Sequence, residues 1–133
     1  MARSKRYSRT KGHSFERFIA NVFKTCGFKD AQRQLEYQAN QAQGIDLAGT
    51  GAFRVQCKKT KTYVSINTIN EVKVKDPASE IPVLIAAGDN LKPMVTMGLD
   101  AFVYLLLSQH ENITLEDAQE LIKQVRKKAS SDA

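Results

Sequence analysis

Asp46, Gln56 and Lys58 are the residues of this sequence whose types and spacing suit phosphodiester chemistry. Oxygen atoms are the ligands that a hard divalent cation prefers, and the backbone carbonyl of Cys57 would add a third oxygen to those of Asp46 and Gln56. Such a set leaves positions for water and for a phosphate oxygen. Lys58 would orient the attacking water or offset the charge that develops on the phosphorane. The spacing therefore favours metal-dependent phosphodiester hydrolysis, and the alternative is a solvated polar hairpin surface.

These residues fall in two short runs that we expect to form a β-hairpin. Residues 45–48 and 53–58 contain β-branched and aromatic side chains and flank a Gly-Thr-Gly triplet. A three-residue turn would pair Asp46 with Arg54 and make Asp46 and Gln56 diagonal neighbours on the polar face, roughly 7–8 Å apart at the backbone. A slip of one residue would instead turn Asp46 toward the apolar face.

A helix before the hairpin contributes a further acid. From Ser14 onward, apolar residues recur at helical spacing, and Gly27 suits the C-cap. Glu16 lies at the border of the apolar stripe, where its carboxylate could face the polar side of the hairpin. The alternative is a first-turn glutamate that the helix dipole favours.

The order of the remaining elements indicates an α/β sandwich around a mixed sheet. Thr114 to Asp117 resembles a capping box that opens the last helix. The apolar helix at residues 99–109 should be largely buried, either in the core or at a dimer interface. The expected elements after the first helix are strands at 28–37, 81–87 and 93–97 and helices at 65–74, at 99–109 and from Thr114 onward.

The composition favours a polyanionic partner. Twenty Lys and Arg residues stand against fourteen Asp and Glu residues, so the formal net charge is +6. An excess of this size favours nucleic acid, although many basic proteins bind none. No apolar run reaches the length of a membrane span and the N-terminus lacks a signal-peptide core, so we expect a cytoplasmic protein without membrane association. The two cysteines lack metal-type spacing, and we expect both to be reduced packing residues.

The sequence predicts one folded domain between two unstructured ends. We expect a flexible basic arm at residues 1–12, one domain at residues 13–128 and a disordered tail at residues 129–133. Like-charged arms often contact the nucleic acid backbone, and the alternative is a solubilising tail. The cationic residues expected to contact DNA are Arg3, Lys5, Arg6, Arg9 and Lys11 in the arm and Lys59 and Lys61 after the hairpin.

Four short motifs together resemble one nuclease family. They are Lys11–Arg17 (KGHSFER), Gly44–Leu47 (GIDL), Gln56–Lys59 (QCKK) and Ile81–Leu84 (IPVL). In this order they resemble the archaeal-type, Hjc-like Holliday junction resolvases of the PD-(D/E)XK nuclease superfamily, and small phage-encoded nucleases share the pattern. The resemblance implies a restriction-endonuclease-like α/β fold, in which helices flank a mixed β-sheet. It also implies a protein of a bacterial or archaeal cell, which could be infected by a phage.

The resemblance also implies an activity. It implies a homodimer that binds four-way DNA junctions and nicks two strands symmetrically with magnesium (Mg2+), for which manganese (Mn2+) can substitute. Carried over by position, Asp46 is the principal metal ligand and Gln56 the second ligand. Glu16 is the helical acid and a further candidate ligand, and Lys58 is the catalytic lysine.

Two arginines also match the family, and one residue differs from the usual family pattern. Arg17 and Arg33 match basic residues that the family uses for DNA contact and activity. The family usually has Glu where this chain has Gln56, and an amide brings one less negative charge, so we predict weaker metal binding. Two other functions stay open: a non-catalytic branched-DNA-binding module with the same fold, and a phage nuclease that acts on flaps or in restriction.

Overall fold

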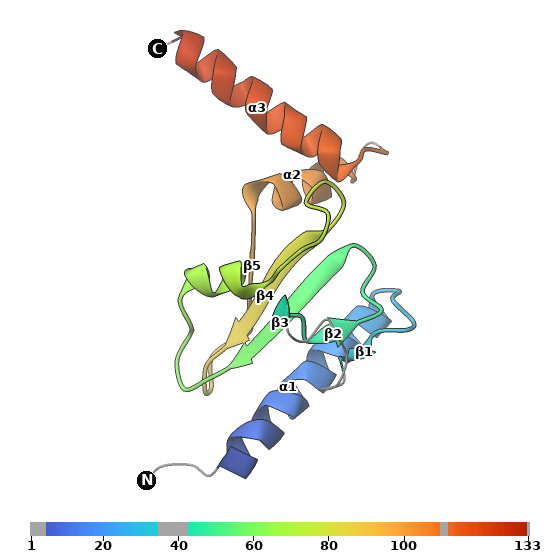
Figure 1. The fold of residues 1–133 in the computed structure, drawn as a ribbon, viewed down its shortest axis with the longest axis vertical. Coiled ribbons are helices and arrows are strands. Elements are labelled where there is room, and N and C mark those ends of the chain that lie inside the picture. Colours follow the sequence, from blue (N-terminus) through green and yellow to red (C-terminus); the bar gives the residue numbers. More distant parts are fainter. Residues whose placement is uncertain (1–4, 35–42, 110–111, 133) are drawn as a thin grey trace.

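The computed structural model describes residues 5–34, 43–109 and 112–132. A three-stranded mixed sheet lies at its centre, with helices packed around it, and this arrangement confirms the expected α/β fold (Figure 1). No helix in these ranges is long and apolar enough to cross a membrane. The elements are α1 (Lys5–Thr25), β1 (Gln32–Arg33), β2 (Leu47–Ala48), β3 (Phe53–Lys59), the 3₁₀ helix η2 (Ile66–Glu71), β4 (Ile81–Ala87), β5 (Met94–Met97), α2 (Leu99–Leu107) and α3 (Leu115–Asp132).

Helix α1 begins at Lys5 rather than near Ser14, so the expectation of a flexible arm over residues 1–12 is wrong from Lys5 onward. Extending an existing helix adds one hydrogen bond for each residue that is fixed, whereas starting a helix is the costly step. No proline interrupts this stretch, and Lys11 forms an ion pair with Asp89 in the turn after β4. The helix therefore continues backward through the basic segment.

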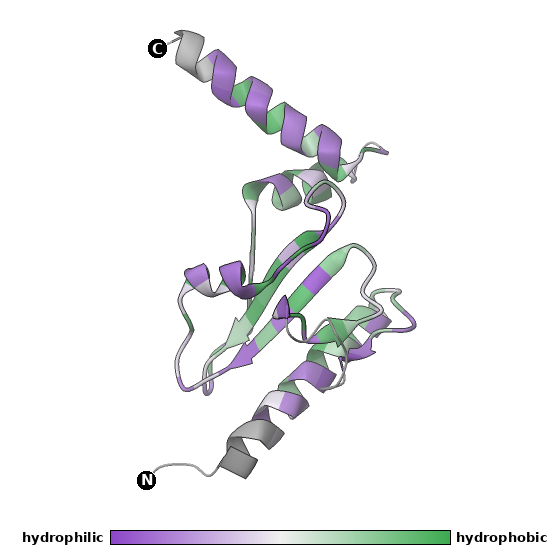
Figure 2. Cartoon of the chain, in the orientation of Figure 1, coloured by the Kyte–Doolittle hydropathy of each residue, from purple (hydrophilic) through white to green (hydrophobic). Residues whose placement is uncertain are grey.

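The central sheet has the order β3-β4-β5. Strands β3 and β4 run parallel and β4 and β5 antiparallel, so the two strands predicted at residues 81–87 and 93–97 are confirmed. Figure 2 shows that hydrophobic residues dominate β4, whereas hydrophilic and hydrophobic residues alternate along much of β3. Apolar side chains of β3 and β4 pack with α1, α2 and the start of α3 in one core. Its buried residues are Phe15, Ile19, Ala20, Leu47, Val55, Cys57, Ile81, Val83, Ile85, Ala87, Ala101 and Leu115.

The predicted hairpin register is wrong. Strand β2 pairs antiparallel with β1 instead of forming a ladder with β3. The backbone N–H of Asp46 donates to the carbonyl of Val55 at 2.8 Å, so Asp46 does not pair with Arg54. Gly49 has φ +73° and lies directly against the backbone of Asp30, which directs β2 toward β1. The strand expected at residues 28–37 is accordingly reduced to β1, and residues 35–37 lie outside the described ranges.

The crossover from β3 to β4 contains η2. A short helix was expected over residues 65–74, and the structure has a six-residue 3₁₀ helix at this place. The Ser65 hydroxyl accepts a hydrogen bond from the Asn67 N–H at 3.2 Å and caps its start. Most of its residues are Ile, Asn or Thr, which form regular helix poorly. This helix lies against β4 and ends at Glu71, beside the polar side chains of β3.

The last two helices differ from the prediction in their exposure. The capping box is confirmed, because Thr114 and Asp117 exchange two hydrogen bonds of 3.1 Å. Helix α2 was expected to be largely buried, but Phe102 and Leu106 are each 51 % exposed. Helix α3 runs to Asp132, so the expected disordered tail at residues 129–133 is helical through that residue. The apolar residues at its start are buried, and the rest of the helix extends away from the sheet (Figure 1).

Candidate active site

The backbone of Asp46 lies between the two sheets. Its N–H donates to the carbonyl of Val55 on β3, and its carbonyl accepts a hydrogen bond of 2.7 Å from the N–H of Gln34, which follows β1. The Asp46 carboxylate then turns back toward β3, where Oδ2 accepts a hydrogen bond of 2.8 Å from the backbone N–H of Cys57. The carboxylate is thus fixed at the edge of β3 that β4 leaves free.

Burial raises the pKa of Asp46 to about 6. The hydrogen bond from Cys57 and the positive charge of Lys58 favour the ionised carboxylate, whereas the negative charges of Glu16 and Glu71 oppose it. The Asp46 carboxylate therefore interacts with Lys58, Glu16 and Glu71 as well as with the N–H of Cys57. Buried carboxylates with raised pKa values are frequent at functional sites, and a bound cation would favour the ionised form of this one.

Gln56 and Lys58 lie on the face of β3 opposite the core. Gln56 is only 4 % exposed, and its Nε2 donates a hydrogen bond of 2.8 Å to Oε2 of Glu71. The Lys58 ammonium lies 3.6 Å from the same oxygen. Glu71 therefore holds both side chains from the end of η2.

Sequence reasoning missed Glu71. The signal that could have identified it is simple, because Glu71 is the one acidic residue between Asp46 and Asp76 in an otherwise basic stretch. Gly44 explains how η2 reaches the site. It has φ +73°, and a Cβ at this position would overlap the backbone carbonyl of Glu71. A glycine just before Asp46 thus allows the two segments to touch.

Glu16 lies at the seam between α1 and β1. Its Oε2 accepts a hydrogen bond of 2.8 Å from Nε of Arg33, and both side chains are mostly buried. Arg17 is exposed on the neighbouring helical position and lines a depression that Arg33 also lines. The two arginines predicted to contact DNA therefore lie side by side, next to the candidate centre.

The oxygen atoms around Asp46 fit a hard divalent ion. Within the described ranges, Oε1 of Gln56 is buried and lacks a hydrogen-bond partner, which is costly unless a cation or water satisfies it. Within a strand the N–H and the carbonyl of one residue point to the same edge. The Cys57 carbonyl therefore lies at the edge where its N–H binds Asp46. No group of three or more His, Cys, Asp and Glu side chains among the described residues could hold a metal. An ion here would therefore depend on amide and backbone oxygens in addition to Asp46.

The Cys57 thiol takes no part in this site. It is buried in the core, and burial raises its pKa, so it remains a protonated packing residue as expected. Cys26 is a free thiol too, but it is exposed just after the end of α1. The packing role expected for Cys26 is therefore wrong.

The other predicted DNA contacts are dispersed. Lys59 donates a hydrogen bond of 2.8 Å to the carbonyl of Gly88, and Lys61 is exposed just beyond β3. Lys11 is engaged by Asp89. Arg3 lies outside the described ranges, and the side chains of Lys5, Arg6 and Arg9 are outside the described part as well.

The comparisons with known proteins agree with this geometry. A family model described as Mrr_cat, restriction endonuclease, matches residues 7–81, more than half of the 133-residue chain. The match extends from α1 to the first residue of β4 and includes Asp46, Gln56, Lys58 and Glu71. No curated protein and no solved structure matches the chain. The chain belongs to the Mrr_cat restriction endonuclease family, and it carries a nuclease domain of the PD-(D/E)XK superfamily.

Proposed function

We propose that this protein is a magnesium-dependent, structure-selective DNA endonuclease that resolves four-way junctions by paired symmetric nicks. One observation carries the chemical part of the proposal. The fixed carboxylate of Asp46, the unpartnered buried oxygen of Gln56 and the ammonium of Lys58 surround one free strand edge in a nuclease domain. Manganese, with similar ligand preferences, should replace magnesium.

The candidate ligands are Asp46, the amide oxygen of Gln56 and the backbone carbonyl of Cys57, with Glu16 nearby. A bound divalent ion would polarise the phosphate and activate water. Lys58 would donate hydrogen bonds to a phosphate oxygen and stabilise the charge that develops there. Glu71 is a positioning residue, because its carboxylate fixes both the Gln56 amide and the Lys58 ammonium.

Several cations support DNA as the substrate. The basic N-terminal part of α1, the exposed Arg17 and the exposed Lys61 would contact phosphates, in keeping with the net charge of +6. Arg33 would keep Glu16 oriented while it approaches the DNA from the same seam. The proposed contacts are Arg3, Lys5, Arg6, Arg9, Lys11, Arg17, Arg33, Lys59 and Lys61.

A homodimer would supply the second centre that paired nicks require. Exposed apolar side chains on α2 and α3 support this part of the proposal, since monomeric proteins rarely leave such side chains together in water. Leu99 is 62 % exposed, Phe102 51 %, Leu106 51 % and Val125 61 %. A two-fold interface formed by these helices would cover them in both copies.

A substrate panel tests the proposed specificity. Mobile four-way junctions, linear duplexes and flaps of the same sequence should be incubated with magnesium, manganese or chelator. Paired symmetric nicks in the junction alone support the proposal. The family match favours a second candidate, a nuclease of restriction-like specificity, and preferential cutting of the linear duplex would support it. Tight junction binding without cleavage under either ion would indicate a non-catalytic module.

A further inference from the structure

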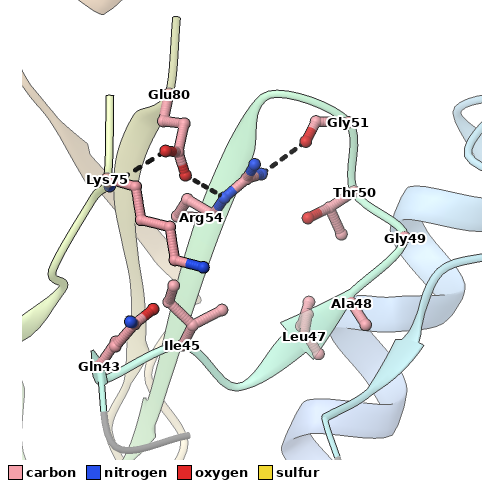
Figure 3. A pocket seen from close by; sticks show the side chains of 10 residues that line it. All are labelled: Gln43, Ile45, Leu47, Ala48, Gly49, Thr50, Gly51, Arg54, Lys75 and Glu80. Atoms are coloured by element: carbon pink, nitrogen blue, oxygen red, sulfur yellow. Dashed lines mark hydrogen bonds and ion pairs between the residues drawn. The ribbon is translucent and has the colours of Figure 1, made fainter. Parts of the chain in front are cut away.

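A cavity of about 330 Å³ opens beside the candidate centre, between the segment that leads into β2 and the start of β4 (Figure 3). Ile45 and Leu47, both buried, form its apolar side. Arg54, Lys75 and Glu80 form its charged side. The candidate catalytic residues do not line it, so the mechanism above leaves this cavity without a role.

The acceptor atoms of the charged side are already engaged. Glu80 Oε2 accepts a hydrogen bond of 2.5 Å from Nε of Arg54. The other oxygen, Oε1, accepts from the backbone N–H groups of Lys75 and Asp76 at 3.0 and 2.8 Å. The carbonyl of Gly51 accepts from Nη1 of Arg54 at 2.6 Å. Arg54 and Glu80 therefore hold each other in place, and the Glu80 carboxylate oxygens have donors within the protein.

Donor groups remain for a ligand. The Lys75 ammonium reaches over the cavity, toward Ile45 and Arg54 (Figure 3). Within the described part of the chain it has no hydrogen bond or ion pair, and Lys75 is exposed. The charged residues that line the cavity are two cations, Arg54 and Lys75, and one carboxylate, Glu80, so their summed charge is positive. A cavity that offers donors and positive charge suits an anion.

The position of the cavity relates that anion to the proposed reaction. Ile45 directly precedes Asp46 in sequence, and Arg54 lies two residues before Gln56 on the same face of β3. Two residues of a strand span roughly 7 Å, a step comparable with the separation of successive phosphates in a DNA strand. A strand whose scissile phosphate lies at Asp46 and Gln56 would thus bring the next phosphate to the cavity.

We propose that this cavity binds a backbone phosphate of the cleaved strand, adjacent to the scissile phosphate. Lys75 is the principal contact, and the pair of Arg54 and Glu80 fixes the wall against which the phosphate lies. This inference rests on the proposed DNA endonuclease function and assigns a second phosphate position to it. The subsite would hold the strand in register while the centre acts on the neighbouring bond.

The first test compares Lys75→Ala with Lys73→Ala. Lys73 is a matched control, because it is exposed two residues away and its ammonium donates to the carbonyl of Asn70, away from the cavity. Affinity for one four-way junction should be measured in chelator over a range of salt concentrations, so that no cleavage is needed. Loss of one phosphate contact should reduce the slope of log affinity against log salt by about 0.9 in Lys75→Ala alone. Equal slopes for the wild type and Lys75→Ala would overturn the proposal.

The second test places the phosphate. A series of four-way junctions, each with one neutral methylphosphonate, should show one position next to the cleavage site where the wild type loses affinity. In Lys75→Ala the same substitution should have no further effect, because the contact is already absent. An undiminished penalty in Lys75→Ala would place that phosphate elsewhere and overturn the assignment. Failure of the wild type to bind any DNA, whether junction, flap or duplex, would overturn the endonuclease proposal itself, which separates the two outcomes.

Discussion

Replacing Gln56 by Glu should destabilise the metal-free protein and strengthen its response to metal. In the wild type the buried amide donates to Glu71 at 2.8 Å. A glutamate there loses this hydrogen bond, which costs about 1–3 kcal/mol, and sets two carboxylates against each other, which adds a cost of similar order. We expect the free energy of unfolding to fall by about 2–4 kcal/mol at neutral pH. For a domain of this size the melting temperature would fall by about 6–15 °C.

Millimolar magnesium should recover most of this loss. A divalent ion between the introduced carboxylate and Asp46 would neutralise the added charge, because both carboxylates would then be ligands. The assay is thermal unfolding of the wild type and Gln56→Glu in chelator and in magnesium. The metal-induced increase in melting temperature should be several degrees larger in the variant.

Gln119→Glu is a matched control for this prediction. Its amide also donates to a carboxylate, Asp100, at 3.3 Å, but on α3 and far along the chain from Asp46. This variant should lose stability without recovery in magnesium. An unchanged melting temperature of Gln56→Glu in chelator would refute the contribution of the Gln56–Glu71 hydrogen bond to stability. The same magnesium response as the wild type would refute the placement of Gln56 beside the ion.

Three further predictions follow from the same region and from α2. Burial raises the pKa of Asp46 from 3.8 to about 6. At pH values between these two, Asp46 is protonated in the folded protein without metal but ionised in the unfolded chain. The free energy of unfolding therefore falls across this window as the pH rises. Asp46→Asn should therefore stabilise the metal-free protein by about 2–3 kcal/mol well above the window and have little effect below it; equal denaturation midpoints of variant and wild type above the window would contradict this. Gly44→Ala should lower the free energy of unfolding by at least about 2 kcal/mol, because alanine is strained at the positive φ of this position and its Cβ would press on the backbone of Glu71. Chemical denaturation measures this loss. A change below about 0.5 kcal/mol, the size of an ordinary surface substitution, would be inconsistent with the contact. Phe102→Glu should convert the proposed homodimer to a monomer in light-scattering measurements. Lys123→Glu, at an exposed position on α3, is the control and should leave the dimer intact. A dimer that survives Phe102→Glu would exclude this interface.

Elements whose physics is local were predictable from the sequence. The run from Ile81 to Ala87 is continuously apolar because both faces of β4 are covered, and its bounds were predicted correctly. The capping box at Thr114 depends on only four residues. The motif residues Asp46, Gln56 and Lys58 were chosen by residue type, and the structure brings them to one edge of β3.

Features that depend on distant segments were not predictable in the same way. The hairpin register failed because β2 pairs with β1, which lies before the hairpin in the chain, and a local turn rule contains no information about that partner. Glu71 was missed because its approach depends on Gly44 and on the path of the crossover. The apolar pattern of α2 indicated burial, but such a pattern does not identify what covers Phe102.

The most direct test of the proposed centre is single-turnover cleavage of the DNA substrate that the wild type cuts fastest. Rates should be measured in magnesium and in chelator for the wild type, Asp46→Asn and Lys58→Ala, with the exposed Asp30→Asn as control. We predict cleavage that requires magnesium, falls by about 10²–10³-fold in Asp46→Asn and in Lys58→Ala, and is unchanged in Asp30→Asn. Cleavage by Asp46→Asn at the wild-type rate, or cleavage that persists in chelator, would contradict the proposed metal-dependent centre.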